Sequence, residues 1–400
     1  MDVNERLPAL RPVDITAAQG ENGEPQFVLQ DRSQVAQGVL QVSAAGYFLL
    51  AHLDGEHTCA DIQAAFLRQF GMRLPAERVW ELVQVLDETC FLHGARYEEA
   101  YAAQRAAYLA APARDNRARY GDGAALRAEL EQMLARGTAA PVQAVRGLIV
   151  PHLDYARGAP CYGDGYATLA QMPPAERYVI LGANHAGRSR SVVATRKDFQ
   201  TPLGLVPTDR LFLDALEGEL GRTLCGEELD HQCEHSVELQ VHIAQVLAGE
   251  QPFEIVPVLC SNVDVSDGGD GDVDEPRLRD FADALARLLA RTDRRTVVIA
   301  GADLSHVGQQ FGEAQPTTAE FMEVVARRDR EVLSLVAAHE EDAMLARVDA
   351  CANETRICSV ACIYALLRAL PGGTCRLLRY HQAVNYAAEM HVTCAAVVVE

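Results

Sequence analysis

Six short apolar runs in the last two thirds of the chain alternate with amphipathic segments, and this alternation limits the fold more than any other feature of the sequence. The intervening segments, such as RLFLDALEGEL (210–220) and SVACIYALLRAL (359–370), have the apolar spacing of helices. Alternation on this scale predicts an α/β domain with a largely buried, mixed β-sheet. The runs expected as strands are AVRGLIV (144–150), RYVILG (177–182), FEIVPVL (253–259), TVVIAG (296–301), CRLLRY (375–380) and VTCAAVVV (392–399).

The composition is that of a globular protein and differs from that of disordered or membrane-embedded chains. Of the 400 residues, 49% are hydrophobic and 23% are charged, which is enough core-forming material for two or three domains. Because the apolar runs fall short of the roughly 20 residues that cross a bilayer, we expect no membrane partner. The N-terminus, MDVNERLPALRPVD, is too acidic and too weakly apolar for a secretory signal, so a cytoplasmic protein is expected.

Charge and cysteine content exclude several kinds of partner and cofactor. Lys and Arg number 36 against 56 Asp and Glu, a formal net charge of −20 that repels phosphate backbones, so we expect no nucleic-acid partner. The 11 cysteines are scattered without a C-x-x-C pair. They are expected to be reduced and mostly buried, and neither a four-thiolate zinc site nor an iron–sulfur cluster is predicted.

The first quarter of the chain has a different pattern, in which strand-like runs precede three short helices. Residues 1–24 are polar and are expected to form a flexible arm, whereas FVLQDRSQVAQGVLQV (27–42) indicates two short strands. Ser43 and Thr58 are suited to cap the first two helices. This order predicts a small winged-helix domain over residues 25–98, with a plain helical accessory domain as the alternative.

A turn within that domain narrows the prediction. The stretch LLAHLDGEHTCADI (49–62), with its L-D-G-x-x-T turn, and the helix that follows resemble the PqqD-like family of peptide-binding winged helices. The resemblance implies that a peptide or protein partner binds this domain, by adding a strand to a sheet edge. Residues 99–140 are rich in Ala, Arg, Glu and Tyr and are expected to form a helical linker to the α/β domain.

Three histidines follow closely on expected strands. His152 comes after GLIV, His185 after YVILG and His306 after VVIAG. In open α/β sheets, ligands bind in the crevice outside the carboxyl ends of the strands. Three imidazoles delivered to that edge are suitable ligands for a transition metal. The sequence therefore predicts a shared metal site, although each histidine taken alone is also compatible with a hydrogen-bonded surface position.

A fourth histidine begins a helix within LDHQCEHSVELQVHIAQVL (229–247). The apolar spacing becomes helical from His235 onward, so this imidazole is expected at a helix N-terminus, where the macrodipole disfavours its charged form. A neutral imidazole suits a metal ligand or a proton acceptor, and Glu234 and Asp230 are placed to orient it. The alternative is a structural role, in which His235 and Ser236 only begin the helix.

Two further patterns point to other metal chemistry. Residues 231–235 (HQCEH) match the H-x-x-E-H pattern of inverted zinc metalloproteases, in which both histidines lie on one helix and the glutamate is the base. The residues before His231 are polar and non-periodic, which argues against such a helix. Residues 270–275 (DGDVDE) resemble the start of a calcium-binding loop, but a glutamate replaces the required glycine, so a solvated surface loop is expected.

Six motifs occur in order along the C-terminal two thirds of the chain: PHLDY (151–155), LGANHAG (181–187), TPLGLVPTD (201–209), EHSVELQ (234–240), DLSHVGQQFG (303–312) and RICSVACIYALL (356–367). Together they resemble the motifs of the Memo family, whose bacterial members are called AmmeMemoRadiSam system protein B. That family resembles the catalytic subunit of class III extradiol dioxygenases, which hold non-haem iron. The resemblance implies a Memo-like, metal-binding mixed-sheet α/β domain over residues 141–400.

The resemblance assigns roles to several residues near the first, second and fourth motifs. His152 and His185 correspond to the two metal-ligand histidines of the family, and His235 corresponds to the acid/base histidine of the related dioxygenases. Asp154 stands where the family has a small residue. It is expected to hold the tautomer of His152 or to reshape the substrate pocket, and Tyr155 to donate a hydrogen bond to a bound oxygen.

The third protein ligand stays open among three residues of the fifth motif. Animal Memo proteins are expected to have a cysteine where this chain has Ser305, and a hydroxyl is a poor substitute for a thiolate on iron or copper. We therefore favour His306 as the ligand. Asp303 is expected to orient His306 or to serve as an alternative ligand.

These roles lead to two functional hypotheses. In the first, Fe(II), with copper or zinc as alternatives, supports an oxidative enzyme that acts on a small molecule or a peptide side chain, with open metal positions for a vicinal diol and dioxygen. His235 would accept the proton of the substrate hydroxyl. In the second, the same domain binds a metal or a partner without turnover.

Overall fold

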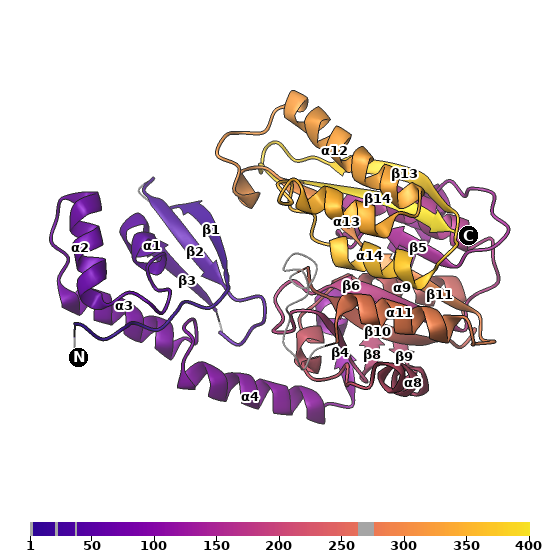
Figure 1. The fold of residues 1–400 in the computed structure, drawn as a ribbon, viewed down its shortest axis with the longest axis horizontal. Helices are drawn as coiled ribbons and strands as arrows, with labels where there is room; N and C mark the ends of the chain where they lie inside the picture. Colours follow the sequence, from indigo (N-terminus) through magenta and orange to yellow (C-terminus); the bar gives the residue numbers. More distant parts are fainter. Residues whose placement is uncertain (1–2, 21–22, 37, 263–275) are drawn as a thin grey trace. The chain divides into compact units, whose positions relative to one another are not determined.

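The computed structural model describes residues 3–20, 23–36, 38–262 and 276–400, and the chain divides into two units, Met1–Ala110 and Ala111–Glu400 (Figure 1). The calcium-like pattern at 270–275 lies outside the described residues. Within those described, none of the helices combines the length and the apolar character needed to cross a membrane.

The N-terminal unit is a three-stranded antiparallel sheet followed by helices. Both expected strands and the three expected helices are present. An additional strand, β1, lies in the segment expected to be a flexible arm, because its backbone pairs with β2 along its whole length. The elements are β1 (Asp14–Gln19), β2 (Pro25–Gln30), β3 (Val39–Ser43), α1 (Ala44–Leu50), α2 (Cys59–Phe70), α3 (Ala76–Glu88) and α4 (Ala95–Ala110).

The helices of this unit begin where side-chain caps satisfy their first amides. The Ser43 hydroxyl accepts a hydrogen bond from the backbone of Gly46 at the start of α1. Thr58 and Asp61 form a reciprocal capping box at the start of α2, with each side chain accepting from the other's backbone N–H. The caps expected from the sequence are therefore confirmed, and the helices bury apolar side chains, including Ile62, in the core of this unit.

A mixed eight-stranded sheet forms the centre of the C-terminal unit. The neighbouring strands β5, β11, β6 and β10 are parallel, and β14 and β7 flank them in antiparallel orientation. All six runs expected as strands lie in this sheet, which confirms the predicted mixed α/β architecture. The strands of the sheet are β5 (Gly147–Val150), β6 (Arg177–Ala183), β7 (Val192–Ala194), β10 (Glu254–Cys260), β11 (Thr296–Gly301), β12 (Asp303–Val307), β13 (Cys375–Ala383) and β14 (His391–Val399). Their spatial order is β12-β14-β5-β11-β6-β10-β7, with β13 paired to β14.

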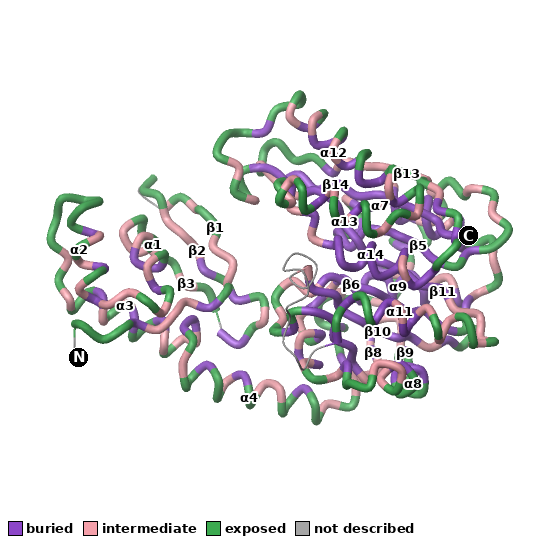
Figure 2. Tube along the Cα trace, in the orientation of Figure 1, coloured by how far each residue is buried: buried purple, intermediate pink, exposed green. Residues whose placement is uncertain are grey.

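Helices cover both faces of this sheet, so its central strands are buried throughout (Figure 2). Alternate side chains enter opposite cores. Leu148 and Ile180 pack with α6 (Gly123–Arg136), α7 (Tyr155–Leu169) and α9 (Ser236–Ala248), whereas Ile149 and Leu181 pack with the helices of the other face. The remaining helices are α5 (Arg117–Tyr120), α8 (Arg210–Leu220), η1 (Glu228–His231), α11 (Leu278–Leu289), η2 (Gln309–Phe311), α12 (Ala319–Ala337), α13 (Glu341–Asp349) and α14 (Val360–Ala369).

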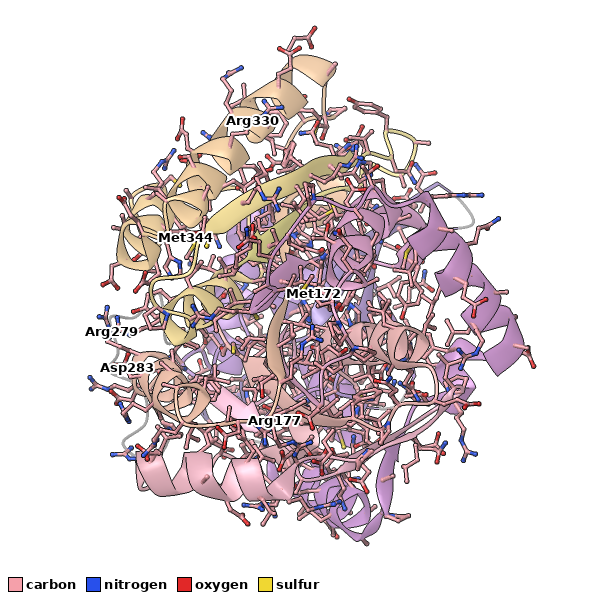
Figure 3. All side chains as sticks on the ribbon, turned by 90° about the vertical axis from the view of Figure 1, so that its right-hand side faces the viewer. Met172, Arg177, Arg279, Asp283, Arg330 and Met344 are labelled. Atoms are coloured by element: carbon pink, nitrogen blue, oxygen red, sulfur yellow. The ribbon has the colours of Figure 1, made fainter. Side chains whose placement is uncertain are left out.

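Ion pairs join the outer helices of the second face. Arg279 and Asp283, both labelled in Figure 3, lie one turn apart on α11. Arg279 pairs with Asp342 of α13 at 2.7 Å, and Asp283 pairs with Arg368 of α14 at 2.7 Å. These contacts tie α11 to the helix that carries the last sequence motif.

The segment expected as a helical linker, residues 99–140, is divided between the two units. Its first helix, α4, belongs to the N-terminal unit. From Ala111 onward the chain joins the C-terminal unit: β4 (Ala113–Asp115) pairs with β8 (Asp198–Thr201), which also pairs with β9 (Gly204–Val206). Helix α6 buries Leu130 in the core beside α7. The structure differs from the expectation because the apolar face of α6 needs a partner and finds it on the sheet domain.

Candidate metal centre

His152 and His185 meet at the edge of the sheet where parallel strands end. β5 and β6 both run parallel to β11, so their carboxyl ends lie at the same edge. Each histidine follows its strand by two residues. The ring centroids are 4.9 Å apart and the rings are nearly perpendicular. The structure thus brings together the two imidazoles that the strand pattern places at this edge.

A third imidazole reaches the same place from α9. The ring centroid of His235, the N-cap residue of α9, lies 5.6 Å from that of His152 and 5.4 Å from that of His185. The helix can approach the strand end because Gly182 has no side chain: a Cβ there would lie 2.3 Å from the Oγ of Ser236. Gly182, in the second motif, therefore allows the close contact that brings His235 to the cluster.

Cys358, which the sequence analysis did not assign to the site, completes the cluster. Its Sγ lies 3.5 Å from the Nε2 of His152. The ligand atoms of Cys358, His152 and His185 all lie within 4.8 Å of one another, as do those of His185, Glu234 and His235. Its position in the sequence was the signal that could have identified it as a metal ligand. Cys358 lies inside the sixth motif and immediately precedes an apolar helix, where thiols ionise readily.

The charges of the cluster favour an ionised thiol. Burial opposes ionisation of Cys358, but His152 and His306 hold the pKa of its thiol well below the ordinary value. Burial likewise opposes protonation of His152, yet Asp303 and the Cys358 sulfur raise its pKa to about 9. These neighbours favour the thiolate, which is the form in which cysteine binds metals.

Glu234 orients both His185 and the start of α9. One carboxylate oxygen, Oε2, accepts hydrogen bonds from the Nδ1 and the backbone N–H of His185, at 2.9 and 3.1 Å. The other, Oε1, accepts from the backbone N–H groups of His235 and Ser236, at 2.8 and 2.9 Å. Burial opposes ionisation of Glu234, but His185 holds the pKa of this carboxyl well below its usual range, so the carboxylate is ionised.

The hydrogen bonds of the two histidines leave the same nitrogen available on each ring. His152 donates from Nδ1 to the carbonyl of Gly301 at 2.9 Å, and His185 donates from Nδ1 to Glu234. With Nδ1 engaged, Nε2 is the nitrogen that each ring would offer to a metal ion once its proton is released, as is usual for histidines that bind metals. Two such nitrogens and a thiolate fit iron, copper or zinc and are poor ligands for magnesium or calcium. The Asp303 carboxylate lies 3.5 Å from the Nε2 of His152 but belongs to neither ligand cluster.

The other two candidates for the third ligand are engaged elsewhere. The Ser305 hydroxyl donates to the Asp329 carboxylate at 2.6 Å. The Nδ1 of His306 lies 3.0 Å from the carbonyl of Leu304, and its ring packs edge-on against Phe311. Among the described residues, neither belongs to the ligand clusters above. The reason is that β12 continues beyond the end of β11, so both residues lie within a strand of their own.

Asp154 and Tyr155 begin helix α7, and their side-chain contacts lie outside the ligand clusters. Asp154 is the N-cap of that helix, accepts the backbone N–H of Arg157 at 3.0 Å and pairs with its guanidinium. The buried Tyr155 hydroxyl donates to the carbonyl of Leu239 at 3.0 Å. The tautomer-fixing role expected of Asp154 is instead filled by a backbone carbonyl at the end of β11.

The inverted-metalloprotease pattern does not form the arrangement that such enzymes need. His231 ends the short helix η1, and α9 begins only at Ser236, so the two histidines of the pattern do not share a helix. The buried His231 donates from Nε2 to the carbonyl of Val193 at 3.1 Å. Burial lowers its pKa to about 3, which keeps this imidazole neutral.

Comparison with known proteins agrees with the fold. The sequence profile of the family described as Memo-like protein matches residues 119–398. A MEMO1 family protein of Methanosarcina mazei is 30% identical over 263 residues, covering 64% of this chain and 87% of the relative. A MEMO1 family protein of Thermus thermophilus is 29% identical, covering 78% of this chain and 89% of the relative. One of Aquifex aeolicus is 24% identical, covering 83% of this chain and 84% of the relative. Because the family profile matches most of its length, the chain belongs to the Memo family.

Proposed function

We propose that this chain is a metal-dependent oxidoreductase whose ion is bound by His152, His185 and Cys358. One observation carries the proposal: the ligand atoms of two histidines and one cysteine lie within 4.8 Å of one another. Fe(II) is the expected ion, with copper or zinc as alternatives that the thiolate favours. When bound, the ion would supply a Lewis-acidic, redox-active centre for a diol substrate and dioxygen.

His235 is suited to accept a proton from the substrate. Loss of hydration beside the other imidazoles lowers its pKa to about 4, so it is neutral at pH 7. Its Nδ1 lies 3.3 Å from the Glu234 carboxylate, and a ring proton on that nitrogen would leave Nε2 as the acceptor. The side chain is 43% exposed, so a substrate hydroxyl can reach it from solvent. A neutral, accessible imidazole beside metal ligands is the arrangement that general-base catalysis requires.

Metal analysis of the purified protein tests the ligand set. After anaerobic purification, the wild type and a Cys90→Ser control, which alters a cysteine of the N-terminal unit, should retain one equivalent of metal. His152→Ala and Cys358→Ser should each lose it, because each removes a donor atom. Undiminished metal in both site variants would overturn the assignment.

Oxygen uptake tests whether the site is catalytic. Iron-loaded protein should consume oxygen with a catechol, and His235→Gln should slow uptake while retaining its metal. Full metal retention without uptake, against both catechols and peptides, would replace the enzyme with a metal-binding module.

We also propose that the N-terminal unit is a winged helix of the PqqD-like type that holds a peptide substrate. Its strand order and capped helices support this proposal. β1 and β3 are the outer strands of its sheet, and outer strands accept an added peptide strand. A chain lacking residues 1–110 should then keep its metal and its catechol activity but bind a peptide substrate more weakly. Equal peptide affinity would refute this role.

A further inference from the structure

The loop that precedes Cys358 has an unusual backbone. Between α13 and α14, Ala352, Asn353 and Arg356 adopt left-handed conformations, with φ values of 48°, 46° and 56°. Residues with a Cβ seldom adopt this conformation, and asparagine tolerates it best. Three such residues within five positions need other contacts to hold them. The loop is therefore a place where a few side chains decide the position of the cysteine that follows.

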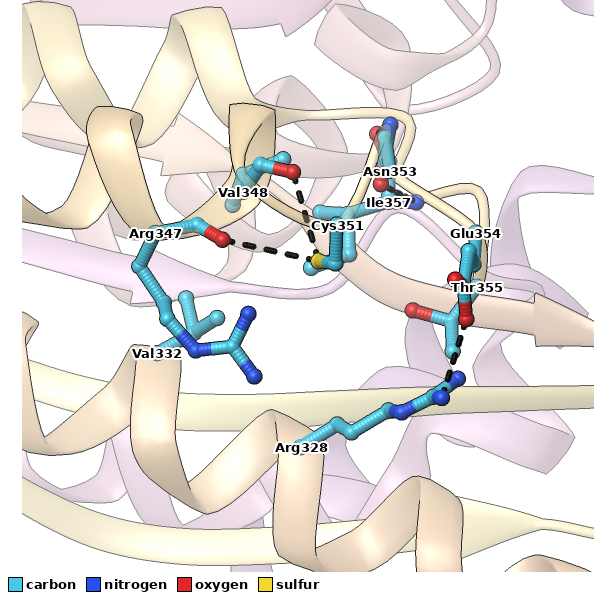
Figure 4. Close-up of a pocket in the computed structure, with 9 residues that line it drawn as sticks. All are labelled: Arg328, Val332, Arg347, Val348, Cys351, Asn353, Glu354, Thr355 and Ile357. Atoms are coloured by element: carbon cyan, nitrogen blue, oxygen red, sulfur yellow. Dashed lines mark hydrogen bonds and ion pairs between the residues drawn. The ribbon is translucent and has the colours of Figure 1, made fainter.

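Side-chain amides provide those contacts at Ile357, the residue before Cys358. The Oδ1 of Asn353 accepts the backbone N–H of Ile357 at 2.8 Å, and its Nδ2 donates to the carbonyl of the same residue at 3.0 Å (Figure 4). Asn262, which follows β10, also donates to the Ile357 carbonyl at 3.0 Å and accepts from Ala361 in the first turn of α14. Both polar groups of the Ile357 backbone are thus held by side chains.

The same loop is joined to β12 on its other side. The backbone N–H of His306 donates to the carbonyl of Thr355 at 2.7 Å, and Arg356 pairs with Glu313 at 2.8 Å. A small pocket lies beside the loop (Figure 4), and Ile357 is buried in the core of the domain. Hydrogen bonds and the burial of Ile357 together hold the loop.

We propose that Asn353 is a positioning residue for Cys358. It holds the peptide groups on both sides of Ile357 and thereby directs the Cys358 sulfur toward His152, 3.5 Å away. The inference deepens the proposed function, on which its metal-binding consequence rests. Placement of the sulfur is nevertheless a property of the metal-free chain as well, so it can be measured without any metal.

Two glycine variants separate the side-chain bonds from the backbone conformation. Asn353→Gly keeps the left-handed backbone but removes both hydrogen bonds to Ile357. Ala352→Gly is the matched control, because it relaxes an equally left-handed residue one position earlier whose methyl group can form no hydrogen bond. Asn353→Asp keeps the acceptor for the Ile357 N–H and tolerates the same φ, so it should restore part of the effect.

Cobalt(II) titration of the full chain is the first measurement. Asn353→Gly should bind cobalt about tenfold more weakly than the wild type, as expected for the loss of two side-chain hydrogen bonds. Its thiolate-to-cobalt charge-transfer absorption should also weaken. Ala352→Gly should match the wild type, and Asn353→Asp should fall between. Equal affinity and equal absorption in Asn353→Gly and the wild type would overturn the inference.

Alkylation of Cys358 in the metal-free chain is the second measurement, read by mass spectrometry. Asn353→Gly should react several-fold faster than either the wild type or Ala352→Gly, because the thiol is released from its half-buried position. If the wild type binds no cobalt but this difference is present, Asn353 positions Cys358 and only the metal assignment fails. If the three proteins react at equal rates, the positioning role is refuted whatever the metal data show.

Discussion

Replacing Glu234 with glutamine changes the hydrogen-bonding capacity of the cluster without changing its shape. The carboxylate accepts four hydrogen bonds, two from His185 and two from the first amides of α9, contributed by His235 and Ser236. A glutamine side chain has one oxygen, which can serve only one of these two sides. Its NH₂ group must then face donors on the other side.

Each orientation of the glutamine has its own cost. If the NH₂ faces His185, the backbone N–H of that residue loses its acceptor, at about 1–3 kcal/mol. The Nδ1 of the ring must also become an acceptor, its proton moves to Nε2, and metal binding should weaken by about 10- to 100-fold. If the NH₂ faces α9, two buried N–H groups lose their acceptor, at about 1–3 kcal/mol each. The free energy of unfolding should then fall by about 2–6 kcal/mol.

Metal titration against a competing chelator, together with denaturant unfolding of the metal-free chain, distinguishes the two orientations. Glu250→Gln, at an exposed position after α9, is the matched control and should leave both quantities unchanged. If Glu234→Gln matches the control in both affinity and stability, Glu234 does not orient the site and the tautomer argument is incorrect.

Three further predictions concern the framework around the site. The folded pKa of His231 is about 3 and its unfolded value about 6.5, so the unfolded chain takes up a proton first and stability falls as the pH drops through this window. At about 1.4 kcal/mol per pH unit, wild-type protein should lose roughly 2 kcal/mol more than His231→Gln between pH 6.5 and 5, measured by denaturant unfolding. Arg114 is buried, donates to carbonyls of the turn before α9 and pairs with Glu238. Arg114→Leu should therefore lower the free energy of unfolding by about 3–5 kcal/mol. A loss below about 1 kcal/mol would contradict the importance of this contact. Gly182→Ala should destabilise the chain by about 1–3 kcal/mol, because the added methyl group would lie 2.3 Å from the Ser236 hydroxyl; an unchanged melting temperature would show that α9 can shift freely.

The sheet and two members of the cluster were predictable because they depend on regular structure. Apolar runs identify buried strands, and parallel strands deliver the residues that follow them to one edge. His152 and His185 follow β5 and β6 by two residues, so little freedom remains in where they lie. His235 was placed by a second regular rule, the helical spacing that begins beside it.

Residues whose positions depend on irregular backbone were not predictable in the same way. Cys358 follows a loop with three left-handed residues, and only the hydrogen bonds of Asn353 and Asn262 to Ile357 show where that loop directs the thiol. The structure places His306 outside the ligand clusters for a related reason. The strand-end rule assumes that the chain leaves the sheet after β11, whereas it enters β12 at once.

The two halves of the cluster are therefore built with different rigidity, and this has a consequence for how substitutions act. His152 and His185 are held by a buried sheet edge, by a carbonyl at the end of β11 and by an ionised glutamate. Moving either ring requires moving the core, so substitutions that reach them should lower stability and metal affinity together. Cys358 is held by a loop whose bonds can be removed one at a time. Substitutions in that loop should change affinity while leaving the sheet intact, which makes the thiol side of the site the place where affinity can be tuned without loss of the fold.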